Sequence, residues 1–193
     1  GTLGSRTAWF FEPYADDPST TGLPQYDENE LIQMICTADS LGFQVGLHCI
    51  GAKANRAALE GYREAGKRFI PRNSRHRLEH AQVIRLQDIP TLNENGVIAS
   101  MQPTHCTSDM RWAEDRIGHE RSKGAYAWRR ILDTGAKISF GTDWPVEPLD
   151  PMRGLYSAVT REGIEIPGPD GGWFPDQKLT MAEAIRLYTL DAA

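Results

Sequence analysis

The stretch that decides the fold is Ile138-Ser139-Phe140-Gly141-Thr142-Asp143-Trp144-Pro145. Residues 137–140 predict a short buried strand, and Gly141 and Pro145 predict that it ends there, because proline cannot extend a strand ladder. A carboxylate at the C-terminal end of a strand, followed at once by a loop, is where α/β barrels carry their chemistry. We therefore expect Asp143 to be a functional residue.

Two other predicted strands end in the same way, on a histidine. They are Phe43-Gln44-Val45-Gly46-Leu47-His48 and Arg77-Leu78-Glu79-His80. Parallel strands in register bring their C-terminal ends together, and imidazole nitrogens and a carboxylate oxygen are ligands for zinc and similar ions. His48, His80 and Asp143 thus predict a metal site, with Asp143 also a candidate general base. Taken singly, each histidine is better explained as a hydrogen-bonded core residue, and it is the three strand-end residues together that favour a metal site.

Strands and helices alternate along the chain, which favours parallel strands joined by helical crossovers. Four strands in 193 residues are too few for an eight-stranded barrel of about 250 residues. The chain also begins in a loop and stops inside a predicted helix, so we expect one partial domain, residues 1–193, from the later part of a barrel. The predicted strands are residues 43–50, 75–80, 97–102 and 137–140. The predicted helices are residues 28–41, 54–65, 84–95 with a restart at Pro90, 120–133 and 151–161, and a last helix begins at the Thr180–Glu183 capping box. The main predicted loops are residues 71–74, 103–118 and 167–175.

Composition narrows the classes of function. The chain is 40% hydrophobic and 24% charged with a net charge of −5, which gives no reason to expect nucleic acid or an anionic membrane as partner. No apolar run approaches the roughly 20 residues of a membrane span. Three cysteines without CxxC spacing argue against disulfides or a zinc knuckle. We expect a cytoplasmic protein with reduced thiols that acts on a small molecule.

Several motifs, in order along nearly the whole chain, carry a resemblance to a known family. They are Gly4-Ser5-Arg6-Thr7-Ala8, His48-Cys49-Ile50-Gly51, Glu79-His80-Ala81-Gln82, Ser100-Met101-Gln102-Pro103-Thr104-His105 and Gly141-Thr142-Asp143-Trp144-Pro145-Val146. This set resembles the amidohydrolase superfamily, and within it the YtcJ-like or amidohydrolase-3 branch, which includes N-substituted formamide deformylases.

The resemblance implies a metal-dependent (β/α)8 hydrolase of which this chain is the C-terminal portion, strands five to eight. His48 and His80 would be the metal ligands of strands five and six, and Asp143 the strand-eight aspartate that contacts metal and water. The implied cofactor is one or two divalent ions, zinc in the first place.

The chain also departs from the family pattern. The first-strand His-x-His pair and the strand-four ligand would precede Gly1, so the sequence predicts half of a metal site. Ala52 stands where the family has an aspartate after Ile-Gly, which removes a carboxylate near His48. His76 is expected to be structural, and His119 to be solvent-exposed at a helix start.

Other residues have weaker signals. Gln102 and His105, at the end of the third predicted strand, either face the pocket and bind carbonyl or amide groups or simply meet solvent. Trp144, like Trp173, either walls an apolar pocket or packs. Arg6 could contact a carbonyl or an anion, although a surface arginine is the commoner case. The remaining candidates for specificity residues lie in the long loop 103–118, namely Asp109, Trp112 and Asp115.

We conclude from the sequence that the full-length protein hydrolyses a C–N bond other than a peptide bond, in an amide, formamide or cyclic amide, through metal-activated water. The alternative is a non-catalytic or truncated barrel fragment. Half a barrel exposes two strand edges and an open core, which would favour a homo-oligomer or pairing with the missing N-terminal half. Phosphoester cleavage has less support, because no basic cluster suited to phosphate appears.

Overall fold

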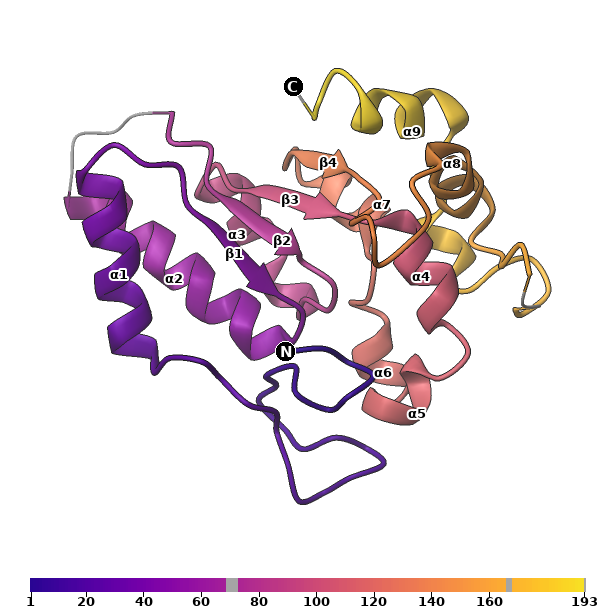
Figure 1. The fold of residues 1–193 in the computed structure, drawn as a ribbon, viewed down its shortest axis with the longest axis horizontal. Helices are drawn as coiled ribbons and strands as arrows, with labels where there is room; N and C mark the ends of the chain where they lie inside the picture. The colour runs from indigo at the N-terminus through magenta and orange to yellow at the C-terminus, as the bar shows by residue number, and fades with distance from the viewer. Residues whose placement is uncertain (69–72, 166–167, 193) are drawn as a thin grey trace.

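A single parallel sheet organises the chain (Figure 1). The computed structural model describes residues 1–68, 73–165 and 168–192, and its strands pair in the order β1-β2-β3-β4. The strands are β1 (Gly46–Cys49), β2 (Arg77–His80), β3 (Ile98–Met101) and β4 (Ile138–Phe140). All three pairings are parallel, so the predicted α/β alternation is confirmed, and the sheet is consistent with part of a barrel.

The register of the strands places their carboxyl ends at one edge of the sheet. Cys49 lies opposite His80 at the ends of β1 and β2, and Met101 lies opposite Phe140 at the ends of β3 and β4. Because each strand stops at nearly the same level, the segments that follow all start from the same side. Residues far apart in sequence can therefore meet there.

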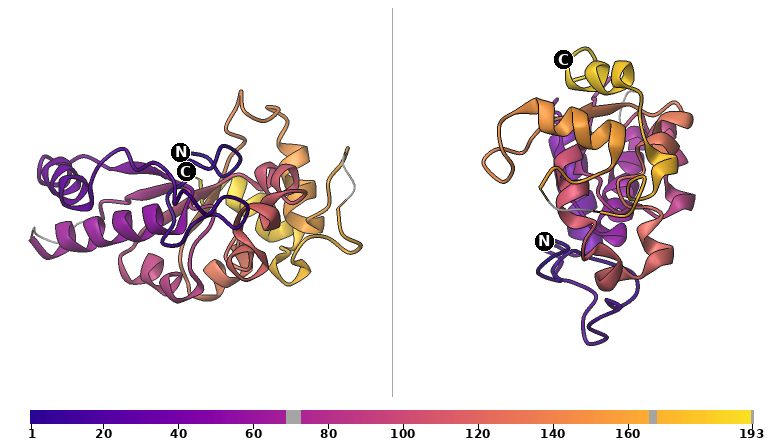
Figure 2. Two further views of the ribbon diagram at one scale, coloured as in Figure 1. Left: turned by 90° about the horizontal axis from the view of Figure 1, so that it is seen from below. Right: turned by 90° about the vertical axis from the view of Figure 1, so that its right-hand side faces the viewer.

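Helices connect the strands, and several of them lie beyond the two edges of the sheet (Figure 1). In Figure 1, α1 and α2 lie on the β1 side and α8 and α9 on the β4 side, and the right-hand view of Figure 2 shows the N-terminal loop and α9 at opposite ends of the molecule. The helices are α1 (Glu28–Ser40), α2 (Ala52–Arg68), α3 (Pro90–Glu94), α4 (Pro103–Asp109), α5 (Ala113–Ile117), α6 (His119–Ser122), α7 (Trp128–Asp133), α8 (Pro151–Thr160) and α9 (Met181–Tyr188), with 3-10 turns η1 (Leu86–Asp88) and η2 (Pro175–Gln177).

Side-chain caps define where three of the helices begin. Asp27 accepts from the backbone N–H of Glu30 at the start of α1, and Asp150 caps α8 ahead of a proline. At α9 the predicted capping box is present, since Thr180 and Glu183 each accept from the backbone N–H of the other. Each cap satisfies N–H groups that have no partner within the helix.

The short strand β4 is the most thoroughly buried of the four. All three of its residues are buried, and the ring of Phe140 lies 5.6 Å from that of Trp128 and 5.5 Å from that of Tyr188. Trp128 itself has no exposed surface. Aromatic packing of this kind holds the strand rigidly, so the loop that leaves it toward Asp143 starts from a fixed point.

The prediction of a long loop at residues 103–118 was wrong, because the structure forms α4 and α5 there. Pro103 occupies the first turn of α4, where a missing N–H costs nothing, and Thr104, Cys106 and Thr107 are buried on the inward side of the helix. Threonine and cysteine have modest helix propensity, so packing against α8, rather than propensity, decides this segment.

The predicted single helix 120–133 is interrupted and forms α6 and α7. The interruption lies where residues 124–126 run beside residues 82–84. There the carbonyl of Gly124 accepts a hydrogen bond from the N–H of Ile84, and the N–H of Tyr126 donates to the carbonyl of Gln82. A Cβ at Gly124 would lie 1.9 Å from the Ile84 carbonyl oxygen, so only glycine allows this approach. Tertiary pairing therefore outweighs local helix propensity here.

Smaller corrections concern boundaries. β1 starts at Gly46 rather than residue 43, and Phe43 is exposed; β2 and β3 are also shorter than predicted. The last helix ends at Tyr188, so the described chain does not stop inside a helix. Parts of the predicted loops 71–74 and 167–175 lie outside the described residues. Among those described, no helix is both long and apolar enough to cross a membrane.

Candidate metal centre

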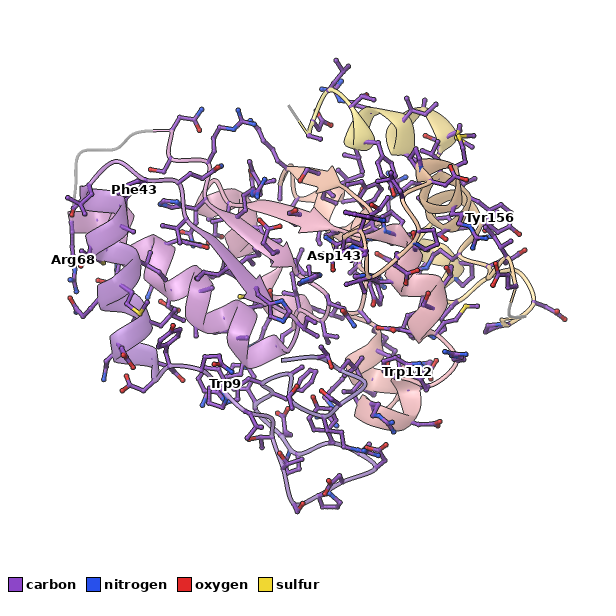
Figure 3. All side chains as sticks on the ribbon, in the orientation of Figure 1. Trp9, Phe43, Arg68, Trp112, Asp143 and Tyr156 are labelled. Atoms are coloured by element: carbon purple, nitrogen blue, oxygen red, sulfur yellow. The ribbon has the colours of Figure 1, made fainter. Side chains whose placement is uncertain are left out.

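Three side chains from three consecutive strand ends meet at the carboxyl edge of the sheet. His80 is the last residue of β2, His105 lies in the first turns of α4 directly after β3, and Asp143 follows β4. One potential ligand atom from each lies within 4.8 Å of the other two. In Figure 3 Asp143 lies between the strand ends and α4. These nitrogen and oxygen donors form a group that could hold a divalent cation.

His80 is held in one orientation and one tautomer. Its Nδ1 donates to Oε1 of Gln102 at 2.9 Å, which leaves the lone pair on Nε2. Burial lowers the pKa of His80, so the imidazole is neutral near pH 7. The backbone of His80 has φ 76°, a left-handed conformation that is unfavourable for a side chain of this size. Such strained backbone concentrates at functional sites.

His105 supplies an imidazole nitrogen without a partner. Its side chain is 12% exposed, and its Nε2 is buried with no hydrogen-bond partner among the described residues. Burial, and then the neighbouring His80, lower its pKa to about 4. Nε2 lies 3.8 Å from Oδ2 of Asp143, which is too far for a hydrogen bond. A neutral buried nitrogen beside a carboxylate oxygen is well suited to share a cation with it.

Asp143 is the most accessible of the three ligands, with 37% of its side chain exposed. It too has a left-handed backbone, with φ 57°. The N–H of Gly141 donates to the carbonyl of Met101, and the N–H of Val146 donates to that of Asp143, so hydrogen bonds hold the loop on both sides. The carboxylate can therefore face both an ion and solvent.

His48 lies beside this cluster but is not part of it. Its ring is 4.6 Å from that of His80, edge to face, and the ring of His105 is 5.8 Å from His80 on a nearly parallel plane. The three imidazoles therefore form a row with His80 in the middle. His48 is exposed, and its Nε2 donates to the carbonyl of Gly1 at 2.7 Å. Among the described residues, the group close enough to share one ion is His80, His105 and Asp143, and it includes two of the three ligands predicted from sequence. The prediction that His48 is a ligand stays a prediction.

The donor set fits a metal ion such as zinc. Two imidazoles of lowered pKa and one carboxylate are nitrogen and oxygen ligands of the kind that zinc binds, and three protein ligands leave a coordination position open. The partnerless Nε2 of His105 is the strongest indication, because a buried polar atom without a partner is destabilising unless something binds it.

The weaker sequence candidates have different roles. Gln102 is buried and holds His80, and Trp144 is 65% exposed beside Asp143. Arg6 donates two hydrogen bonds to the carboxylate of Asp16 in the N-terminal loop. The guanidinium of Arg6 is therefore already paired. Trp173 is buried and donates to Glu114, a packing role. Ala52, where the family has an aspartate, is buried at the start of α2.

Two other histidines have the predicted roles. His76 is 7% exposed, stacks on Tyr62 at 4.8 Å and lies 3.1 Å from Asp39, as a structural residue should. His119 begins α6, has a side chain that is 60% exposed, and is hydrogen-bonded to Glu114. Neither joins the row of imidazoles, because both lie outside the carboxyl ends of the strands.

An apolar cavity of about 210 Å³ opens beside His48. It lies between the N-terminal loop and β1, and the residues that line it are mostly apolar, among them Trp9, Leu23, Tyr26, Leu47 and Ile50. A ligand group that entered it would be surrounded by carbon atoms, with one imidazole at the wall.

Comparison with known proteins agrees with the geometry. The model of the amidohydrolase family matches residues 1–193. Over its whole length the chain is 38% identical to the putative amidohydrolase YtcJ of Bacillus subtilis (strain 168), and it covers 36% of that protein. It is 26% identical to the N-substituted formamide deformylase of Arthrobacter pascens, over 87% of this chain and 30% of that enzyme.

A solved structure gives the same result for the fold. The crystal structure of an uncharacterized metal-dependent hydrolase from Pyrococcus horikoshii OT3 superposes with a TM-score of 0.87 at 34% identity, covering 100% of this chain and 38% of the other. The chain thus spans about a third of the length of the curated relatives that it matches. It belongs to the amidohydrolase family.

Proposed function

We propose that the protein is a metal-dependent hydrolase of C–N bonds other than peptide bonds, acting on a small amide, formamide or cyclic amide. The observation that carries this proposal is the convergence of His80, His105 and Asp143, whose ligand atoms lie within 4.8 Å of one another. We also propose that residues 1–193 are strands five to eight of a (β/α)8 barrel, with the rest of the barrel outside this sequence.

The chain's own residues have distinct tasks in such a reaction. His80 and His105 would hold a divalent ion, zinc in the first place, with His48 the next nearest imidazole. The ion would supply a water of lowered pKa and polarise the substrate carbonyl. Asp143, exposed toward solvent, would take the proton of that water and pass it to the leaving nitrogen. The water oxygen bonds to the carbonyl carbon, the C–N bond breaks, and the products are an acid and an amine.

The apolar cavity beside His48 supports a neutral substrate with an apolar substituent. Its lining is carbon-rich, so an alkyl or aryl group would lose water on entering it. The N-substituted formamide deformylase of Arthrobacter pascens is a relative of this chain. N-substituted amides and formamides are therefore the first substrates to assay.

The test is zinc binding together with hydrolysis of a panel of amides, formamides and phosphoesters. In the full-length protein, Asp143→Asn should retain the fold and lose nearly all turnover, because an amide side chain cannot take up the proton. Turnover within tenfold of the unmodified protein would discard the role of Asp143. Preferential cleavage of phosphoesters would discard the proposed bond class.

A second proposal concerns the isolated chain. In the described residues β1 and β4 each pair on one side only, so both edges of the sheet can accept another strand. We propose that the chain associates with a second copy or with the complementary part of the barrel. Size-exclusion chromatography with light scattering tests this proposal: a monomer that binds one zinc and hydrolyses amides would contradict it.

A further inference from the structure

A hydrogen-bonded cluster of Asp109, Gln82 and Tyr126 lies close in sequence to the two histidines of the candidate metal centre. The carboxylate oxygen Oδ2 of Asp109 accepts from Nε2 of Gln82 at 2.8 Å and from the hydroxyl of Tyr126 at 2.7 Å. Gln82 and Tyr126 are 3% and 2% exposed. Two neutral donors from buried residues thus meet on one oxygen of a half-buried carboxylate.

No cation pairs with Asp109 within the described part of the chain. Burial raises the pKa of its carboxyl to about 6, although the two hydrogen bonds lower it, and the pKa of Tyr126 is raised well above its ordinary value. Near pH 7 the carboxylate is therefore still mostly ionised, and its charge is stabilised by the hydrogen bonds from its two donors. Hydrogen bonds to a charged acceptor are stronger than neutral ones, so the cluster is a rigid point in the fold.

The cluster connects the two segments that carry the imidazole ligands. Asp109 lies four residues after His105 on α4, one helical turn along the same face. Gln82 lies two residues after His80. A hydrogen bond between the side chains of Asp109 and Gln82 therefore joins the element that bears one ligand to the turn that bears the other.

That turn needs to be held. His80 and Ala81 both have left-handed backbone, with φ 76° and 45°. Consecutive non-glycine residues in this region are strained and persist only where their surroundings impose the conformation. Gln82, the next residue, is fixed at both ends: its side chain donates to Asp109, and its carbonyl accepts from the N–H of Tyr126 at 2.8 Å.

We propose that Asp109 is a positioning residue for the metal centre: through Gln82 it holds the His80–Ala81 turn, and through α4 it sets His105 against that turn. The proposal builds on the metal site proposed above. Asp109 itself need not touch the ion or the substrate. Without Asp109, the imidazoles of His80 and His105 should no longer be held at a fixed separation, and metal affinity should fall. Mutation of residues that orient metal ligands typically lowers metal affinity by about 10- to 100-fold.

The experiment compares three variants of the full-length protein. Asp109→Ala removes both hydrogen bonds, whereas Asp109→Asn can still accept both through its one amide oxygen. The matched control is Thr107→Val, which lies on the same helix and cuts a buried 2.9 Å hydrogen bond to Ser157 without any link to the His80 turn. Zinc affinity is measured by calorimetry, coordination by the visible spectrum of the cobalt-substituted protein, and stability by thermal melting.

We expect Asp109→Ala to weaken zinc binding by about 10- to 100-fold and to change the cobalt absorption bands. Asp109→Asn should recover most of the affinity and the wild-type spectrum. Thr107→Val should lower the melting temperature and leave both metal readouts unchanged. A purely structural role for Asp109 predicts instead that Thr107→Val and Asp109→Ala behave alike, and that result would overturn the proposal.

A measurement on the metal-free protein separates this proposal from the metal site itself. Imidazole ¹⁵N shifts of His80 and His105 report tautomer and environment, and they should move in Asp109→Ala and not in Thr107→Val. If the unmodified full-length protein binds no zinc, the proposed metal site is wrong, and these shifts still test the positioning role. Unmoved shifts in Asp109→Ala would reject it. Should that variant not fold, Gln82→Met, which cuts one bond only, carries the same expectations.

Discussion

The imidazole of His80 donates its Nδ1 hydrogen to Oε1 of Gln102 at 2.9 Å, where β2 and β3 end side by side. Because an amide oxygen can only accept, this bond decides which nitrogen of His80 keeps its lone pair. Gln102 also occupies the N-cap position of α4, so one residue orients the first imidazole and begins the helix that carries the second.

Replacing Gln102 by leucine should weaken zinc binding by about 10- to 100-fold, because His80 loses the acceptor that fixes its tautomer and ring orientation. Gln177→Leu is the matched control, since Gln177 is 2% exposed and its Oε1 also accepts a hydrogen bond, but it belongs to η2. Isothermal calorimetry measures both. Equal affinities for the two variants would refute an orienting role for Gln102.

Alanine substitutions along the row of imidazoles should rank the ligands. His80 lies in the middle and belongs to both the predicted and the observed cluster, so His80→Ala should abolish measurable zinc binding. His105→Ala should weaken binding more than His48→Ala, because the Nε2 of His105 faces Asp143 whereas that of His48 donates to Gly1. Zinc affinity is measured by competition with a chromogenic chelator. If His48→Ala weakens zinc binding more than His105→Ala does, the ligand set expected from sequence, with His48 in place of His105, is the correct one.

Ionised Glu183 should stabilise the folded chain, and this contribution to the free energy of unfolding should be lost at acidic pH. Hydrogen bonds from Arg129, and the capping bond from Thr180, lower its pKa to about 2. A carboxyl group whose pKa is lower in the folded state adds stability above its unfolded pKa of about 4.5, and the gain is lost as pH falls toward 2. The side chain is 35% exposed, so the effect is moderated by solvent.

The measurement is thermal melting of Glu183→Gln against the unmodified chain. The difference in melting temperature should be constant at neutral pH and shrink as pH falls below about 4.5. Glu94→Gln is the control, because Glu94 at the end of α3 forms no ion pair within the described residues. A difference that stays the same down to pH 2.5 would show that the carboxylate charge is not what stabilises α9.

Alanine substitutions at two glycines near α2 should change the free energy of unfolding in opposite directions. A Cβ at Gly51, just before the helix, would lie 2.2 Å from the carbonyl oxygen of Trp9, so Gly51→Ala should cost about 1–3 kcal/mol. At Gly66, inside the helix, no atom lies within 4 Å of the added Cβ, and alanine should stabilise by about 0.5–1 kcal/mol. Urea unfolding tests both; a neutral Gly51→Ala would mean that the N-terminal loop does not pack as described.

The local pattern of the sequence was sufficient to predict the alternation of strands and helices and two of the three residues in the candidate metal group. The short strand-like segments that lead to His80 and Asp143 are visible in the sequence, and Gly141 and Pro145 mark the end of the second one. These are properties of neighbouring residues. The same is true of the capping box at Thr180, which needs only a four-residue motif. Such features depend on the chain within a few residues, and so they can be inferred from sequence alone.

The tertiary structure alone decided the rest. His105 comes close to His80 and Asp143 because α4 forms where a loop was expected. The buried face of α4 packs on α8, a contact about fifty residues away in the sequence. The interruption at Gly124 likewise depends on a backbone pairing with residues 82–84. Long-range contacts of this kind leave no periodic signal in sequence, since each requires a surface that exists only after the sheet has assembled.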